Sequence, residues 1–146
     1  MTARVNWLAV AVMSVVYFAM GAVWYTAFAE PWRIGVGKTQ EQLMAHNGGS
    51  PMPYIVTFVC NFILASVLAQ LIVATGKATW KHGIRVGFLA WAGFIATTIM
   101  MDYQFEGRTF TIWAINCGYP LVGMLVMGAV LGAWTKKEQL TAAAKA

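Results

Sequence analysis

The side chains best suited to chemistry stand between residues 102 and 119, where two long apolar runs meet. They are two acids and one cation, followed by an amide and a phenol: Asp102, Glu106, Arg108, Asn116 and Tyr119. Ionisable groups near a membrane are candidates for a polar vestibule that takes an ion or a small solute. Alternatively, Arg108 neutralises Asp102, whose charge opposes the dipole at the end of a helix, and so fixes a tight turn. The sequence leaves both interpretations open.

Two asparagines stand at similar depth inside the second and fourth apolar runs, as the pairs Cys60-Asn61 and Asn116-Cys117. Together with the related segments that begin at Tyr25 and Tyr103, they hint at two similar hairpins. If the repeat is real, Asn61 and Asn116 meet near the axis of a helix bundle. Buried amides there form interhelical hydrogen bonds worth about 1 kcal/mol or less each. The alternative is a polar site in the outer half of the bundle.

The sequence offers no set of residues for catalysis or metal binding. His46 and His82 fall in loops on opposite sides of the predicted membrane, so they cannot share a metal ion. The segment 35–39 resembles the end of a phosphate-binding loop, but that motif needs glycine where Trp32 stands. We therefore expect no enzyme activity, no metal and no cofactor.

Composition points to a membrane protein. The chain has 146 residues, of which 60% are hydrophobic and only 10% are charged, whereas soluble domains carry about 25% charged residues. A helix needs roughly 20 apolar residues to cross a bilayer. Four runs meet this length: residues 5–28, 53–75, 83–103 and 110–134. Each is expected to be helical, since lipid offers no partner to an open backbone.

Large aromatic residues cluster near the ends of these runs. Tryptophan and tyrosine prefer the two membrane interfaces, so seven of them are predicted to be interface anchors: Trp7, Trp24, Tyr25, Trp32, Trp80, Trp113 and Trp134. Trp7 and Trp24 bracket the first run at a spacing of roughly 25 Å, near the thickness of the hydrocarbon layer.

The positive residues give an orientation. Arg4, the loop around residues 76–81 and the tail of residues 135–146 are rich in Lys and Arg, whereas the other two loops balance cations with acids. Cytoplasmic loops carry the excess of Lys and Arg, so both termini are predicted to be cytoplasmic. Short loops then give an up-down-up-down four-helix bundle. The net charge of +5 is divided between separate segments, which argues against nucleic-acid binding.

The only long loop, residues 30–52, is predicted to lie outside the cell. Pro31 is expected to end the first helix, because proline cannot continue one. Thr39 and Gln42 have the spacing of a capping box, which predicts a short helix to about residue 46. Leu43 and Met44 give this helix an apolar side, so it is expected to lie on the outer membrane surface.

Two pairs of glycines have the spacing that lets helices approach closely: Gly83 with Gly87, and Gly128 with Gly132. We expect this spacing to serve packing inside the bundle rather than dimerisation.

Several short motifs resemble a known family. They are Asn6, Gly21-x-x-Trp24-Tyr25 and Trp32 in the first half, and Glu106-Gly107-Arg108, Trp113 and Asn116-x-Gly118-Tyr119 in the second. Over about residues 5–134 the chain resembles small bacterial membrane proteins known as domain of unknown function 1761. The resemblance implies a four-helix inner-membrane protein and transfers no catalytic or ligand residue. Small multidrug transporters match in helix count only, because their first helix carries an embedded glutamate.

These observations favour a structural or accessory subunit of the bacterial inner membrane. Its expected partners are membrane lipid and either a second copy of the chain or a larger membrane complex. The alternative is a small transporter or channel whose polar site lies at the outer ends of the second, third and fourth helices. A membrane enzyme that acts on lipid or quinone is disfavoured, since no nucleophile stands with a base.

Overall fold

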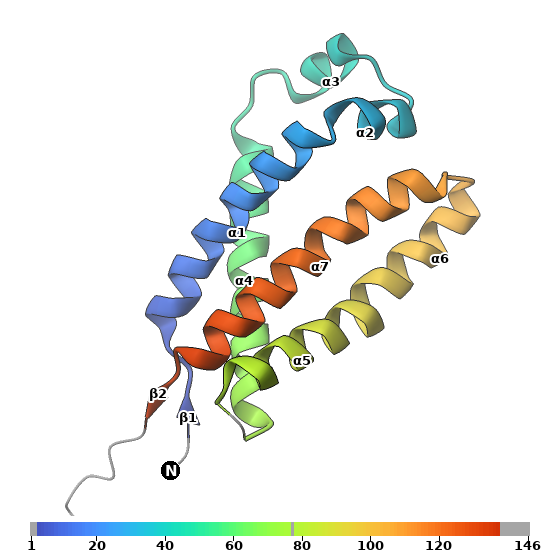
Figure 1. Ribbon diagram of the computed structural model, residues 1–146. Helices are drawn as coiled ribbons and strands as arrows, with labels where there is room; N and C mark the ends of the chain where they lie inside the picture. The colour runs from blue at the N-terminus through green and yellow to red at the C-terminus, as the bar shows by residue number, and fades with distance from the viewer. Residues whose placement is uncertain (1–2, 77, 138–146) are drawn as a thin grey trace, which may run out of the picture.

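The computed structural model describes residues 3–76 and 78–137, and in this part the chain is helical apart from one short strand pair (Figure 1). Four helices are long and apolar enough to cross a membrane: α1 (Trp7–Ala27), α4 (Met52–Ala74), the continuous helix Trp80–Glu106 and α7 (Phe110–Ala133). The four predicted runs are confirmed, and the largest differences are at the ends of the third, which starts at 80 instead of 83 and stops at 106 instead of 103.

The loop between α1 and α4 holds two short helices, α2 (Ala29–Val36) and α3 (Gln40–Asn47). The capping box predicted at Thr39 and Gln42 is present at the start of α3. The first helix ends at Ala27, close to the predicted position, but Pro31 does not end it, because a second helix, α2, follows almost directly. Pro31 lies in the first turn of α2, where the backbone N–H has no helical acceptor and proline is tolerated.

The third spanning helix changes its winding halfway. It runs as α5 (Trp80–Ala90), a π-helical segment η1 (Trp91–Ala96) and α6 (Thr97–Glu106). Two indoles fasten the π segment to α7: Trp91 donates to the carbonyl of Cys117 (2.9 Å), and Trp113 donates to the carbonyl of Ala96 (3.3 Å). Such segments are wider than an α-helix, and the apolar pattern of the sequence does not predict one.

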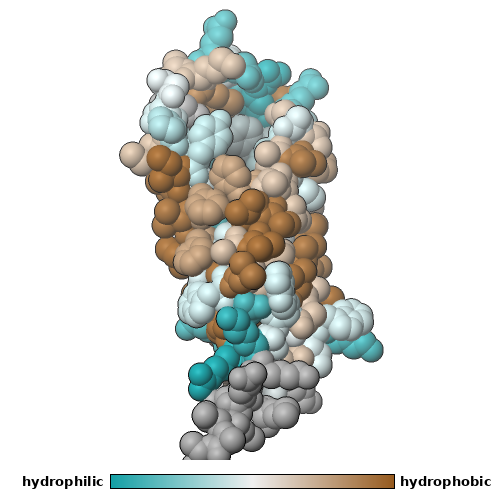
Figure 2. All heavy atoms as spheres, turned by 90° about the vertical axis from the view of Figure 1, so that its left-hand side faces the viewer, coloured by the Kyte–Doolittle hydropathy of each residue, from teal (hydrophilic) through white to brown (hydrophobic). Residues whose placement is uncertain are grey.

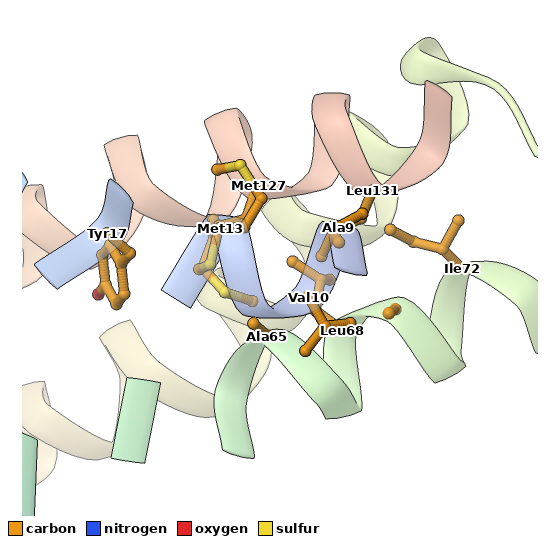
Figure 3. Packing of buried hydrophobic residues seen from close by; sticks show 11 residues of the cluster. Ala9, Val10, Met13, Tyr17, Ala65, Leu68, Ile72, Met127 and Leu131 are labelled. Atoms are coloured by element: carbon orange, nitrogen blue, oxygen red, sulfur yellow. The ribbon is translucent and has the colours of Figure 1, made fainter. Parts of the chain in front are cut away.

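Helix α7 is the centre of the molecule, since it contacts α1, α2, α4, α5, η1 and α6. Its second half joins the first half of α1 and the second half of α4 in an apolar core (Figure 3). The residues labelled there are Ala9, Val10, Met13 and Tyr17 of α1, Ala65, Leu68 and Ile72 of α4, and Met127 and Leu131 of α7. The core therefore lies toward the end of the molecule that carries the termini.

Glycines bring α5 and α7 into backbone contact. A Cβ atom on Gly83 would lie 1.8 Å from the carbonyl oxygen of Gly128, and one on Gly87 would lie 2.3 Å from that of Met124. Gly132 approaches the backbone at Thr79 and Gly83 in the same way. The prediction that both glycine pairs serve packing inside the bundle is confirmed.

The two ends of the described chain pair as strands that the sequence did not predict. β1 (Ala3–Arg4) and β2 (Lys136–Lys137) are antiparallel, with Ala3 opposite Lys137. They lie at one end of the molecule, and α2 and α3 lie at the other (Figure 1). Between these ends the surface carries a hydrophobic belt (Figure 2). Of the predicted tail, residues 138–146 lie outside the described residues.

Candidate functional site: the Asn116 cluster

The half of the molecule remote from the termini is joined by hydrogen bonds between side chains. The Oδ1 atom of Asn116 accepts a bond from the hydroxyl of Tyr25 (3.2 Å) and one from the indole N–H of Trp32 (3.1 Å). The Nδ2 atom of Asn116 donates to the hydroxyl of Tyr103 (2.6 Å). We call these four residues the Asn116 cluster. They come from α1, α2, α6 and α7, so one amide connects four helices.

The cluster uses most of the hydrogen-bonding capacity of the Asn116 side chain. An amide side chain has two acceptor positions and two donor hydrogens, and three of these four are occupied here. All four members are half-buried. The cluster contains no carboxylate, imidazole or amine, and its ionisable groups are the phenols of Tyr25 and Tyr103.

Two further contacts hold α1 against α7 beside the cluster. Trp24 donates its indole N–H to the carbonyl of Ile115 (3.0 Å), and its ring packs where Gly118 has no side chain. Pro120 has no N–H to donate to the carbonyl of Asn116, one turn earlier in α7. The carbonyls of the two residues that flank Asn116 accept hydrogen bonds from indoles. Trp24 donates to Ile115, and Trp91 donates to Cys117.

Tyr119 lies one turn closer to the apolar core. Its ring stacks on Tyr17 at 4.5 Å between centroids, and its hydroxyl donates to the carbonyl of Tyr17 (2.8 Å). The absence of a side chain at Gly21 makes room for this hydroxyl. Asn61 is close enough to Tyr119 to interact with its hydroxyl. However, the Nδ2 atom of Asn61 is buried and has no hydrogen-bond partner among the described residues.

The asparagines Asn61 and Asn116 do not bond to each other. Asn116 binds the three aromatic residues of its cluster, whereas Asn61 faces Tyr119 one turn below. The predicted polar residues of α4 and α7 thus form two separate sites at different depths. Two aromatic donors, from α1 and α2, and one phenol acceptor, from α6, occupy three of the four hydrogen-bonding positions of Asn116.

The charged residues at the turn between α6 and α7 differ from the sequence expectation. The Nε atom of Arg108 pairs with Glu106 instead of Asp102, and both partners are well exposed. Gly107 adopts a left-handed conformation (φ 64°), which turns the chain and brings its two neighbours together. The guanidinium also lies 5.2 Å from the centre of the Tyr103 ring, while Asp102 is exposed. The predicted pairing of Arg108 with Asp102 is therefore wrong.

The predicted interface anchors divide into two groups. Trp7, Trp80 and Trp134 are 55%, 53% and 43% exposed. Trp24, Tyr25, Trp32 and Trp113 instead donate their N–H or O–H groups inside the protein. Sequence reasoning missed that Tyr25 and Trp32 belong to the polar site. Their seven-residue spacing puts them on one helix face, but this signal is visible only if helical structure continues past Pro31.

A family model described as protein of unknown function (DUF1761) matches residues 8–132. The chain belongs to this family. No curated protein and no solved structure matches it. Several of the motifs on which the resemblance rested contact one another in the DUF1761 protein. Gly21 faces Tyr119, Trp24 packs on Gly118, and Tyr25 and Trp32 bond to Asn116.

Proposed function

We propose that this DUF1761 protein resides in the bacterial inner membrane, with both termini in the cytoplasm and four spans that alternate in direction. The pairing of β1 with β2 supports this orientation because it gathers Arg4, Lys136 and Lys137 at one end of the hydrophobic belt. Cytoplasmic segments attract such positive residues. The opposite end, with α2 and α3, then faces outward.

Single cysteines test this orientation. On a Cys60→Ser and Cys117→Ala background, a Ser50→Cys variant is expected to react with a membrane-impermeant maleimide added to intact spheroplasts. A Lys136→Cys variant is expected to react only after the membrane is opened. Equal labelling of both positions from outside would contradict the proposed topology.

We further propose that the protein is a structural or accessory subunit of a membrane assembly, without an enzymatic role. The observation that carries this proposal is the outer platform, which we define as α2 and α3 (residues 29–47). Trp32 bonds to Asn116, and Gly35 packs on Ile112 at a distance too short for a Cβ atom. Helix α2 is thus held on the bundle while it exposes Ile34 (71%), and Met44 of the neighbouring α3 is 64% exposed. We propose that these exposed apolar side chains, at the end of the molecule that carries α2 and α3, contact a protein partner.

Site-specific photo-crosslinking tests the accessory role. A benzophenone amino acid at position 34 or 44 is expected to give one discrete protein adduct in native membranes. The adduct partner, identified by mass spectrometry, separates a second copy of the chain from a different subunit. Phe94, which is 74% exposed in the middle of a span, provides the matched control position. A protein that forms no adduct at 34 or 44 and runs as a monomer in mild detergent would contradict this proposal.

A second candidate function is a small transporter or channel, and it is favoured by the buried Nδ2 atom of Asn61, which has no hydrogen-bond partner among the described residues. Buried amide groups normally have a partner, and a passing solute would supply one. The test is flux of ions and common solutes in proteoliposomes, with Asn61→Leu and Asp102→Asn compared with the wild type. Flux that is lost in the Asn61 variant supports transport, and the absence of flux in the wild type argues against it.

A further inference from the structure

A cleft opens in the outer platform beside the Asn116 cluster. Its volume is about 270 Å³, and it is lined by Tyr25, Ala29, Trp32, Arg33, Gln40 and Leu43. Two adjoining hollows also include Arg33 and Gln40, and they extend to Lys38 on one side and to Glu30 on the other. Arg33 therefore lies where the three hollows meet.

The charge of Arg33 is not neutralised by the rest of the described chain. The side chain is half-buried, and it forms no ion pair with any residue in 3–76 or 78–137, Glu30 included. A guanidinium keeps its positive charge in proteins, and its planar fork matches the oxygens of a phosphate group. Lys38 adds a second positive charge in one adjoining hollow, and the carboxylate of Glu30 lines the other. These features favour an anion with several oxygens.

The walls of the cleft indicate what the anion is attached to. Apart from Arg33 and Gln40, the lining is apolar or aromatic, and burying such surface is favourable at about 25 cal/mol per Å². A free phosphate ion would leave these walls in water. A phosphate that carries hydrocarbon would cover them and reach Arg33 at the same time.

The position and the rigidity of Tyr25 and Trp32, the two aromatic residues that line the cleft, agree with a lipid ligand. The residues that line the cleft belong to α1, α2 and α3. Helices α2 and α3 lie at the end of the molecule beyond the hydrophobic belt (Figures 1 and 2). Tryptophan and tyrosine rings prefer the headgroup level of a bilayer. The side chains of Tyr25 and Trp32 are already fixed by their bonds to Asn116, so a ligand need not order them on binding.

We propose that this cleft binds the phosphate of an anionic phospholipid through Arg33, with Tyr25 and Trp32 packed against the glycerol region. The inference rests on the membrane placement proposed above, but it does not require a protein partner.

Lipid retention tests the site. The full-length protein is purified from nanodiscs that contain phosphatidylglycerol and phosphatidylcholine, and bound lipid is counted by native mass spectrometry. The wild type is expected to retain phosphatidylglycerol preferentially, and Arg33→Gln is expected to weaken this retention about tenfold, as the loss of one charged hydrogen-bonding group predicts. Leu43→Asp, which puts a carboxylate into the cleft from α3, is expected to have the same effect without altering the bundle. Arg108→Gln removes a cation at the same end outside the cleft and provides the matched control.

The competing outcomes are distinct. If millimolar inorganic phosphate displaces phosphatidylglycerol from the wild type but not from Arg33→Gln, the cleft takes phosphate from a soluble source as well as from lipid. If phosphate does not displace it, the ligand is the lipid headgroup. Equal retention by the wild type, Arg33→Gln and Leu43→Asp would overturn the proposal. This result is independent of the crosslinking experiment, so failure of the lipid site and failure of the accessory role can be told apart.

Discussion

Replacing Gly83 with alanine is expected to destabilise the folded protein more than any other single methyl group added to α5. The new Cβ atom would lie 1.8 Å from the carbonyl oxygen of Gly128, which belongs to backbone and cannot rotate away. Adding a methyl group to a packed core costs about 1–3 kcal/mol, and this contact should lie at or above the upper value. Reversible unfolding of the detergent-solubilised protein in sodium dodecyl sulfate, followed by circular dichroism, measures the loss.

Gly93 on the same long helix provides the matched control for this substitution. A Cβ atom there would meet no other atom within 4 Å, so Gly93→Ala should leave stability unchanged or raise it slightly, since alanine is the better helix former. Gly128→Ala should reproduce the effect of Gly83→Ala from the other side of the contact, where the Cβ atom would lie 2.3 Å from the carbonyl oxygen of Gly83. Similar unfolding curves for the Gly83 and Gly93 variants would contradict this account of the helix crossing.

The spanning helices and the glycine crossing were predictable because one residue property determines each of them. Lipid makes hydrophobicity nearly sufficient to identify a span, and Gly83 and Gly128 matter because they lack a side chain. The π-helical segment was not predictable in this way. It depends on contacts between Trp91 or Trp113 and carbonyls on another helix, and such contacts exist only after the helices have packed.

Of the four residues in the Asn116 cluster, only Asn116 was predicted to belong to a polar site, and none of the hydrogen bonds of the cluster was predicted. Asn116 and Tyr119 were identified as polar residues inside an apolar run. Of their partners, Tyr103 lies 13 residues from Asn116, whereas Tyr25, Trp32 and Tyr17 lie 84–102 residues away along the chain. Two acids, Asp102 and Glu106, are close to Arg108 in the sequence. The left-handed turn at Gly107 brings Arg108 to Glu106. Tyr25 and Trp32 were assigned to the membrane interface because tryptophan and tyrosine are common there. That statistical preference does not show that their polar atoms point inward.

The two halves of the molecule are held together by different kinds of contact. Near the termini, apolar side chains and glycines pack α1, α4, α5 and α7 together. Toward the platform, α6 has no buried residue, and the side chain of Tyr103 in α6 accepts a hydrogen bond from Asn116 of α7. Helices in lipid gain no hydrophobic stabilisation from mutual contact, so close packing and hydrogen bonding are the two available means. Damage to one half should therefore leave the other largely intact.

Replacing Asn116 with leucine tests this division. The variant keeps a similar volume but removes three hydrogen bonds, and it leaves Tyr25, Trp32 and Tyr103 without their partner. Interhelical hydrogen bonds in membranes contribute about 0.6 kcal/mol each on average, and unpaired half-buried donors add a further penalty. A total loss of about 2 kcal/mol or more is expected. Hydrogen–deuterium exchange should rise in residues 29–36, whereas the core segments around Val10 and Leu68 stay protected.

Gln70→Leu is the control for this loss of an amide. Gln70 is exposed on α4 and donates only to the carbonyl of Ser66 in its own helix, so its replacement should be neutral or slightly stabilising in lipid. Uniform exchange throughout the Asn116→Leu variant would mean that the cluster supports the whole bundle rather than the platform. An unchanged exchange profile in residues 29–36 would mean that Gly35 and its contact with Ile112 are sufficient to hold α2.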